Sequence, residues 1–411
     1  MQGTMFSLFR IALRNVIRNR RRSLLTLAAV FLAVAIMVTV HGVLNGLHAS
    51  IRDQVVNGQT GAIQIHRKGY LKSVQGAALE LDVPADDVFL SKVAKIDGIT
   101  AVAPRIFFGG MANAHDQTVV ALFFAFDPVR ELRVCPTRAK IVTSGRMIAP
   151  GMPNGADLST ELMRRIAAKK GEKVALLSND VDGSLGAVEV DVAGEIGDGG
   201  MPMPDKKIAV LPLGVAQELL RMPGRATEIA ISVRDLDQIG AIIPKVRAAV
   251  GPEYEVSSWR QVAGFVDQLI EIENFALNVV AATFLGIAML GIANTMLMNV
   301  LERTREIGTM MAVGLRRRGI LTLFLAEAGL LGLTGATAGA ACGLAIVAHF
   351  GRVGMHFHTA GNTKELPMYP FAQAPFVLFV FALAVVGAVL AALYPAWRAS
   401  RLRPIQALGQ A

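Results

Sequence analysis

The stretch LLTLAAVFLAVAIMVTVHGVL, residues 24–44, decides the fold of this chain. It carries no charged residue at neutral pH, and a helix of this length crosses a bilayer core of ~30 Å at ~1.5 Å per residue. Three more apolar segments of similar or greater length follow at residues 275–300, 320–350 and 376–394. The sequence therefore predicts an α-helical membrane protein with four transmembrane helices.

A segment of a different kind separates the first apolar run from the second. Residues 48–272 mix the alternating pattern of half-buried strands with the 3.6-residue period of helices. Strands are predicted at 62–66, 101–111, 118–126, 174–177, 187–196, 208–211 and 228–233, and helices at 88–96, 213–221 and 236–250. This mixture predicts a large extracytoplasmic α+β domain, or two small α+β lobes, between the first two spans.

Two junction segments and three regions complete the predicted organisation. Residues 49–56 and 259–273 continue the helical pattern beyond the spans, which predicts two uninterrupted helical stalks. The chain then divides into 1–47 with an interfacial helix and the first span, 48–272 with the α+β domain, and 273–411 with three spans, their connectors and the tail.

The positive charge of the chain is concentrated beside the apolar segments. The net charge is +9, and residues 1–23 carry six arginines without an acidic residue. The connector 301–320 carries five arginines against two glutamates, and the tail after residue 394 carries three arginines. Arginine-rich flanks stay in the cytoplasm. Both termini and the connector are thus predicted to be cytoplasmic, the α+β domain periplasmic, and no nucleic-acid partner is expected.

The N-terminal segment has two distinct faces and is expected to be retained. A helix there would place Phe6, Phe9, Leu13 and Ile17 on one side and Arg10, Arg14, Arg18 and Arg21 on another, which is typical of a helix lying along the membrane surface. A cleaved signal peptide is the alternative, but the apolar run of residues 24–44 is too long for one.

Small residues recur at helical spacing within the spans. Gly335, Gly339 and Gly343 follow each other at steps of four, and Gly387 adds a shorter strip in the last span. Such strips let helices approach closely in lipid, so these glycines are predicted to pack helices together. Glu327 is the acidic residue within the spans. It lies near the cytoplasmic end, where it could reach the interface or pair with an arginine, and we expect a structural contact rather than a proton relay.

No catalytic or metal-binding set is recognisable. The sequence lacks the phosphate-binding, zinc-protease and G-x-S-x-G nucleophile motifs. His349, His356 and His358 lie close together, but no carboxylates accompany them, so no metal site is predicted. The chain is expected to be a non-catalytic membrane subunit that binds no cofactor, its energy coming from another protein.

Three motifs on the predicted cytoplasmic side resemble those of the FtsX/MacB-type permeases of ABC transporters. They are RNVIRNRRRSLLT at 14–26, GIANTMLMNVLERTREIG at 291–308 and YPAWRASRLRPIQAL at 394–408. The resemblance implies a dimer with a second permease copy or a paralogue, and a separate cytoplasmic ABC ATPase that holds ATP and magnesium. It also implies mechanotransmission, in which the periplasmic domains move with the nucleotide cycle.

The same resemblance implies that residues 302–315 couple the chain to the ATPase. On a short helix, Glu302, Arg303 and Glu306 are spaced for ion pairs. The candidate coupling residues are Glu302, Arg303, Arg305, Glu306, Ile307, Gly308, Met311 and Gly314.

Within the family, the α+β segment looks most like the Lol-type lipoprotein-releasing permeases. The similar stretches are GAIQIHRKGY at 61–70, ATEIAI at 226–231 and Ser258-Trp259. The function implied is extraction of lipoproteins from the bacterial inner membrane and their transfer to a periplasmic carrier. The alternatives are MacB-like export of peptides or small molecules with an adaptor and outer-membrane duct, and FtsX-like activation of a cell-wall hydrolase.

Two candidate sites belong to the Lol-type interpretation. An apolar cleft between the first two spans would hold acyl chains, with Phe31, Val38, Phe275 and Val279 as its predicted lining. A loop rich in glycine and proline would recruit the carrier through Gly200, Met201, Pro202, Met203 and Pro204, unless it is an ordinary hairpin loop.

Overall fold

The computed structural model describes residues 10, 12, 14, 15, 18, 20–73, 78–197, 207–357 and 366–401. Two compact units make up the chain. The helical base comprises Met1–Ala49, Ile270–Met355 and Pro367–Ala411, and the strand domain comprises Ser50–Leu269 and His356–Leu366. The apolar residues predicted for the N-terminal interfacial helix and the whole predicted carrier loop lie outside the described residues.

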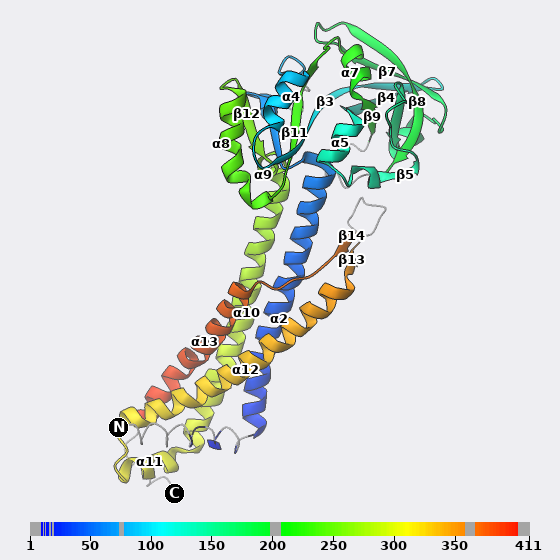
Figure 1. Ribbon diagram of the computed structural model, residues 1–411. Coiled ribbons are helices and arrows are strands. Elements are labelled where there is room, and N and C mark those ends of the chain that lie inside the picture. Colours follow the sequence, from blue (N-terminus) through cyan, green and yellow to red (C-terminus); the bar gives the residue numbers. More distant parts are fainter. Residues whose placement is uncertain are drawn as a thin grey trace. The chain divides into compact units, whose positions relative to one another are not determined.

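Four long helices build the base and confirm the four predicted spans (Figure 1). They are α2 (Arg20–Val55), α10 (Gly264–Glu302), α12 (Arg317–Val353) and α13 (Ala374–Ser400), with the short α11 (Thr304–Ala312) between α10 and α12. Each is long and apolar enough to cross a membrane. The four helices therefore form the membrane part of the chain, as the apolar runs indicate.

The strand domain contains a ten-stranded sheet. Its strands are β1 (Ile63–Arg67), β3 (Ile99–Ala114), β4 (Gln117–Phe126), β5 (Val142–Gly145), β6 (Gly155–Ser159), β7 (Lys173–Asn179), β8 (Leu185–Ile196), β9 (Ile208–Pro212), β11 (Glu228–Val233) and β12 (Tyr254–Ser258). The order is β12-β1-β11-β3-β4-β9-β6-β8-β5, and β7 pairs with both β3 and β8. The pairings therefore close a ring through β3, β4, β9, β6, β8 and β7.

Helices and short ladders complete the strand domain. The helices are α3 (Tyr70–Ser73), α4 (Asp87–Ala94), α5 (Pro128–Val134), α6 (Thr160–Arg165), α7 (Leu213–Leu219) and α8 (Ile239–Val250). Asp86 and Asp127 accept backbone hydrogen bonds at the starts of α4 and α5, so both helices are capped. Two small sheets pair β2 (Val83–Pro84) with β10 (Arg225–Ala226) and β13 (Met355–Phe357) with β14 (Leu366–Met368).

The two stalks join the strand domain differently. After α2 the chain makes a π-helical turn, η1 (Val56–Thr60), and enters β1 through Gly61, whose φ is 75°. On the way out, β12 leads into the short helix α9 (Trp259–Val262), which is separated from α10 by the non-helical Ala263. The prediction of an uninterrupted helix over residues 259–273 is therefore wrong. Ser258 and Gln261 form a capping box that starts a separate helix, a signal that a helical pattern alone does not reveal.

The entry and exit strands are hydrogen-bonded neighbours. β1 and β12 pair antiparallel from Ile63 opposite Ser258 to Arg67 opposite Tyr254. The N–H of Trp259 also donates to the carbonyl of Ala62, 3.0 Å away. The chain thus enters and leaves the strand domain at one edge of its sheet.

Candidate functional site

The predicted packing glycines lie where two helices of the base meet at backbone distance. A Cβ atom on Gly339 would lie 2.6 Å from the carbonyl oxygen of Phe31, and one on Gly343 would lie 2.8 Å from Val38 Cβ, both in α2. Gly335 faces Val30 and Leu27 of α2 in the same way, while Gly387 of α13 faces Met289 of α10. Any larger residue on this face of α12 would force α2 away.

The predicted coupling segment divides into a buried and an exposed face. Ile307 and Gly308 of α11 are buried, and Ile307 belongs to the apolar core of the base, with Met311 packed against that core. Arg305 and Gly314 are exposed, and Val313 just beyond α11 is 85% exposed. Only the exposed face is available to a partner.

Ion pairs within the chain neutralise both glutamates of the coupling segment. Arg303 Nε lies 2.7 Å from Glu306 Oε2, Arg18 Nη2 lies 2.9 Å from Glu306 Oε1, and Arg22 forms two hydrogen bonds with Glu302. The hydrogen bond from Arg303, followed by the nearby charges of Arg303 and Arg18, lowers the pKa of Glu306 despite partial burial. Arg303 also lies 3.8 Å from the buried Glu327 of α12. These side chains therefore hold α11 to the base.

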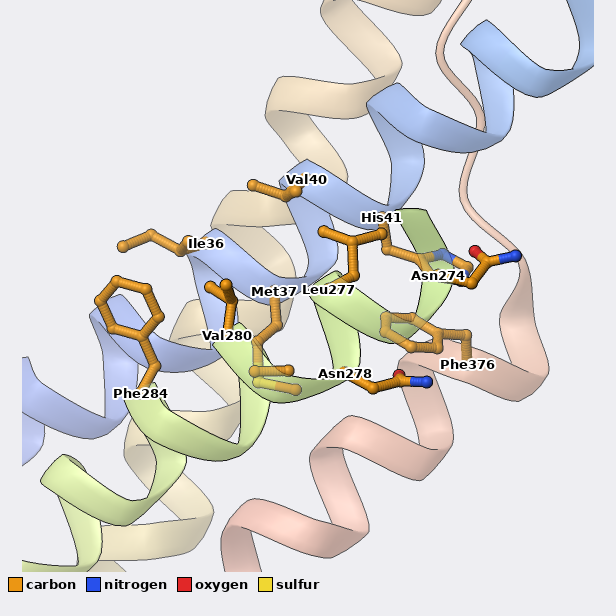
Figure 2. Close-up of a pocket in the computed structure, with 11 residues that line it drawn as sticks. Ile36, Met37, Val40, His41, Asn274, Leu277, Asn278, Val280, Phe284 and Phe376 are labelled. Atoms are coloured by element: carbon orange, nitrogen blue, oxygen red, sulfur yellow. The ribbon is translucent and has the colours of Figure 1, made fainter. Parts of the chain in front are cut away.

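A cavity of about 240 Å³ lies between α2, α10 and the start of α13 (Figure 2). Its walls are mainly apolar, whereas one end carries an imidazole and two amides. The lining residues are Ile36, Met37, Val40, His41, Asn274, Leu277, Asn278, Val280, Ala281, Phe284 and Phe376. Such a cavity fits a chain-like apolar ligand with a polar head group.

An aromatic stack closes the polar end of this cavity. The His41 ring lies face to face with Phe376, with 3.5 Å between ring centroids and 6° between planes. Asn45 Nδ2 lies 3.0 Å from His41 Nδ1 and donates to the carbonyl of Phe371, 3.4 Å away. α2 and α13 thus hold the histidine ring in a fixed orientation.

The predicted acyl-chain residues do not line this cavity. Val38 is buried against Gly343 of α12, and Phe31 has its carbonyl against Gly339. Phe275 and Val279 are 71% and 50% exposed on α10. The four residues lie on the two helices that line the cavity but on other faces of them, because one residue along a helix rotates the side chain by about 100°. Asn274 and Asn278, one turn apart in an apolar run, are the signal that could have fixed the face.

The strand domain contains a buried charge network that was not predicted from the sequence. Arg105 donates to both carboxylate oxygens of Glu131 at 2.8 Å and to Glu228 at 3.2 Å. Arg138 Nε lies 2.6 Å from Glu131, and His66 Nε2 lies 3.7 Å from Glu228. Arginine and glutamate within apolar strand segments were the available signal, since buried charges are paired.

Electrostatics keeps this network charged despite its burial. Burial opposes charge on Arg105, but Glu131, Cys135 and Glu228 raise its pKa above the ordinary value. Burial also opposes charge on Glu228, yet hydrogen bonds and charges from His66 and Arg105 lower its pKa to about 2. The contact between Arg105 and Glu228 is therefore an ion pair at neutral pH.

Metal binding finds no support in the described part of the chain. Among the described residues, no group of three His, Cys, Asp or Glu side chains is placed to hold a metal ion. Of the three clustered histidines, His358 lies outside the described residues.

Family models match two regions that together extend over most of the chain. The FtsX-like permease C-terminal model matches residues 278–404. The MacB-like periplasmic core domain model matches residues 23–249, which include most of α2 and most of the strand domain.

Similar proteins carry two different functional names. The lipoprotein-releasing system transmembrane protein LolC of Xylella fastidiosa is 22% identical over 94% of this chain and 93% of that protein. The macrolide export ATP-binding/permease protein MacB of Marinobacter nauticus is 24% identical over 97% of this chain and 60% of that protein. The solved periplasmic region of MacB from Actinobacillus actinomycetemcomitans is 11% identical over 53% of this chain and 95% of that structure, with a TM-score of 0.36.

Proposed function

Since this chain belongs to the FtsX-like permeases of ABC transporters that carry a MacB-like periplasmic core domain, we propose that it extracts lipoproteins from the bacterial inner membrane. In this proposal the strand domain is periplasmic and passes the cargo to a periplasmic carrier. The chain works with a second permease copy or a paralogue and with a cytoplasmic ATPase that holds ATP and magnesium.

The cavity between α2, α10 and α13 is the observation that carries the proposal. An acyl chain is attracted by apolar walls at ~0.8 kcal/mol per buried methylene group. The ester and amide carbonyls that join acyl chains to a lipoprotein accept hydrogen bonds, and the amide groups of Asn274 and Asn278 at the polar end can donate them. The cavity therefore matches both parts of a lipid anchor.

The exposed face of the coupling segment is the proposed docking surface for the ATPase. Arg305 offers a charge that the chain itself does not pair within the described residues, and Val313 offers an apolar contact. Glu302, Arg303 and Glu306 act differently, because they form ion pairs within the base. Glu306 of α11 pairs with Arg18 and Arg303, and Glu302 at the end of α10 pairs with Arg22 of α2. When the ATPase closes, its contact with α11 would then move α11 and the base together.

Photo-crosslinking from the cavity tests the proposed cargo. A photoreactive amino acid replaces Leu277 in the cavity wall, and the matched control places it at Val279, two residues away on the exposed face of the same helix. In native membranes, we expect lipoproteins to crosslink to the photoreactive residue at position 277. We expect no such crosslink from position 279. Equal crosslinking at both positions, or none at 277, would contradict the proposal.

Export of a soluble peptide or small molecule is the second candidate, and the similarity to MacB over 97% of this chain favours it. Purification of the tagged chain from its native membrane separates the two. An ATPase together with lipoproteins supports extraction, whereas an ATPase with an adaptor and an outer-membrane duct supports export. If no ATPase copurifies under conditions that preserve other ABC complexes, both fail.

A further inference from the structure

The end of the first stalk is held by side chains from the strand domain. The carbonyl of Gln59 in η1 accepts a hydrogen bond from Arg105 Nη1 at 2.8 Å and another from Arg138, and the carbonyl of Thr60 lies 3.3 Å from Arg105 Nη1. The N–H of Thr137 donates to the carbonyl of Asn57 at 3.0 Å. Carbonyl groups at a helix C-terminus carry partial negative charge, so two guanidinium groups are strong partners for them.

Arg105 cannot turn away from this position without breaking other charged bonds. Its guanidinium group is fully buried, and Glu131 holds it with two parallel hydrogen bonds of 2.8 Å. A bidentate pair of this kind fixes orientation as well as distance. Arg105 therefore ties the last turn of the first stalk to β3, which carries it, and to α5 through Glu131, in addition to the bonds from Arg138 and Thr137.

The second stalk has no comparable attachment among the described residues. α9 ends at Val262, Ala263 has φ −97° and ψ 42°, and α10 begins at Gly264. Backbone hydrogen bonds connect the residues around this break: the N–H of Ala263 donates to the Trp259 carbonyl at 2.7 Å, and the N–H groups of Val266 and Asp267 donate to the Ala263 carbonyl at 2.8 and 3.4 Å. A Cβ atom on Gly264 would meet nothing within 4 Å, so no neighbouring atom packs against Gly264 itself, although Trp259 before the break and Val266 after it are buried.

We propose that α2 is joined rigidly to the strand domain through Arg105 and that α10 is joined through a hinge at Ala263 and Gly264. α2 is then the stalk that carries displacement into the domain, while the hinge accommodates movement of α10 relative to α2. Arg105 is a positioning residue in this device. Its biological meaning rests on the proposed function, but the joint and the hinge are properties of the chain itself.

Distances between spin labels measure the two junctions separately. One label replaces Lys92 on α4, and the second replaces either Arg52 on the first stalk or Glu271 on the second, all three exposed. Cys342 is replaced by serine, and the buried Cys135 is left in place. In the full chain with its copurified ATPase, we expect a narrow distribution of the distance between labels at 52 and 92. For labels at 271 and 92, we expect a broad distance distribution that changes with nucleotide.

Two variants assign the behaviour to the named residues. Arg105→Gln combined with Glu131→Gln removes both charges of the pair, and we expect it to abolish the narrow 52–92 distribution without changing the 271–92 pair. Gly264→Ala favours a helix at the break and is expected to narrow only the 271–92 distribution. Arg225→Gln, which breaks a pair with Asp82 elsewhere in the strand domain, should change neither.

The proposal is overturned if the 52–92 distribution is as broad as the 271–92 distribution in the wild-type chain, or if nucleotide moves neither pair. Should the double variant fail to fold, Arg138→Gln removes one clamp on Gln59 and leaves both bonds between Arg105 and Glu131 in place. A chain that copurifies with no ATPase contradicts the proposed function alone, because the widths of the two distributions still test the joint and the hinge.

Discussion

At the scale of single residues, Gly339 shows how closely α12 and α2 approach. A methyl group there would lie 2.6 Å from a backbone carbonyl that cannot rotate away. We expect Gly339→Ala to destabilise the base by about 1–3 kcal/mol through overpacking. Gly329→Ala on the same helix is the control, because its Cβ would meet Val389 at an ordinary 3.6 Å. Thermal unfolding in detergent should show a lower midpoint for the first variant only.

Asp157 provides a pH-dependent prediction in the strand domain. Burial raises its pKa to about 6, and the hydrogen bond from the Ile148 N–H at 2.8 Å lowers it only in part. The folded chain therefore keeps a proton that the unfolded chain loses near pH 4, and stability falls as pH rises between these values. Above pH 6, the free energy of unfolding is lower by about 3 kcal/mol than it is at low pH, where Asp157 is protonated in both states.

Asp157→Asn removes this loss because the amide does not ionise and its oxygen can still accept from Ile148. We expect the variant to unfold at a higher temperature than the wild-type chain at pH 8, and the difference to shrink at pH 4. An advantage that does not depend on pH would contradict the assignment of the proton to Asp157.

The residue scale also shows what local sequence can and cannot determine. Gly335, Gly339 and Gly343 could be identified as one strip because their spacing follows from helical geometry alone. Phe31, Val38, Phe275 and Val279 could not be sorted into cavity and non-cavity positions in this way. In an apolar span every face of the helix carries apolar residues. The sequence pattern therefore does not distinguish a side chain facing lipid from one facing a cavity.

At the scale of elements, the segment around α11 contains two kinds of residue. Some form ion pairs within the base, and others are exposed and are proposed to contact the ATPase. Arg305→Glu alters an exposed side chain and is expected to reduce ATPase stimulation without lowering thermal stability. Arg303→Glu is expected to lower the unfolding temperature, because a carboxylate would then replace the partner of Glu306 beside the buried Glu327. A coupled ATPase assay and thermal unfolding of both variants test these different roles of Arg305 and Arg303. If both variants lose the same amount of thermal stability, the proposed difference is wrong.

Elements with a strong period were predictable, and short irregular ones were not. β4 and β8 alternate over many residues, β3 is the longest of the three, and the strands predicted there are present. β6 (GADLS) lacks alternation and β12 (YEVSS) alternates over only a few residues, and both form because neighbouring strands supply their hydrogen bonds. α9 and the break at Ala263 depend on a cap rather than on hydrophobic period, which explains the error in the second stalk.

At the scale of the whole molecule, filling the cavity should separate cargo handling from ATP hydrolysis. Leu277→Trp occupies space that an acyl chain would use, and displacing two methylene groups, at ~0.8 kcal/mol each, weakens binding about tenfold. We expect lipoprotein release from proteoliposomes to fall accordingly while basal ATPase activity persists. Val279→Trp, on the exposed face, is the control, and an equal effect of both substitutions would remove the cavity from the mechanism.

The pairing of β1 with β12 also has a consequence for how the chain folds. Before the strand domain forms, α2 and α10 are the ends of a disordered loop of about 200 residues, and closing such a loop costs entropy that grows with its length. Once β1 and β12 pair, the same two helices are separated by the equivalent of a tight turn. Completion of the strand domain therefore brings the first two spans together, and a domain of different sequence could be inserted there if its own first and last strands were adjacent.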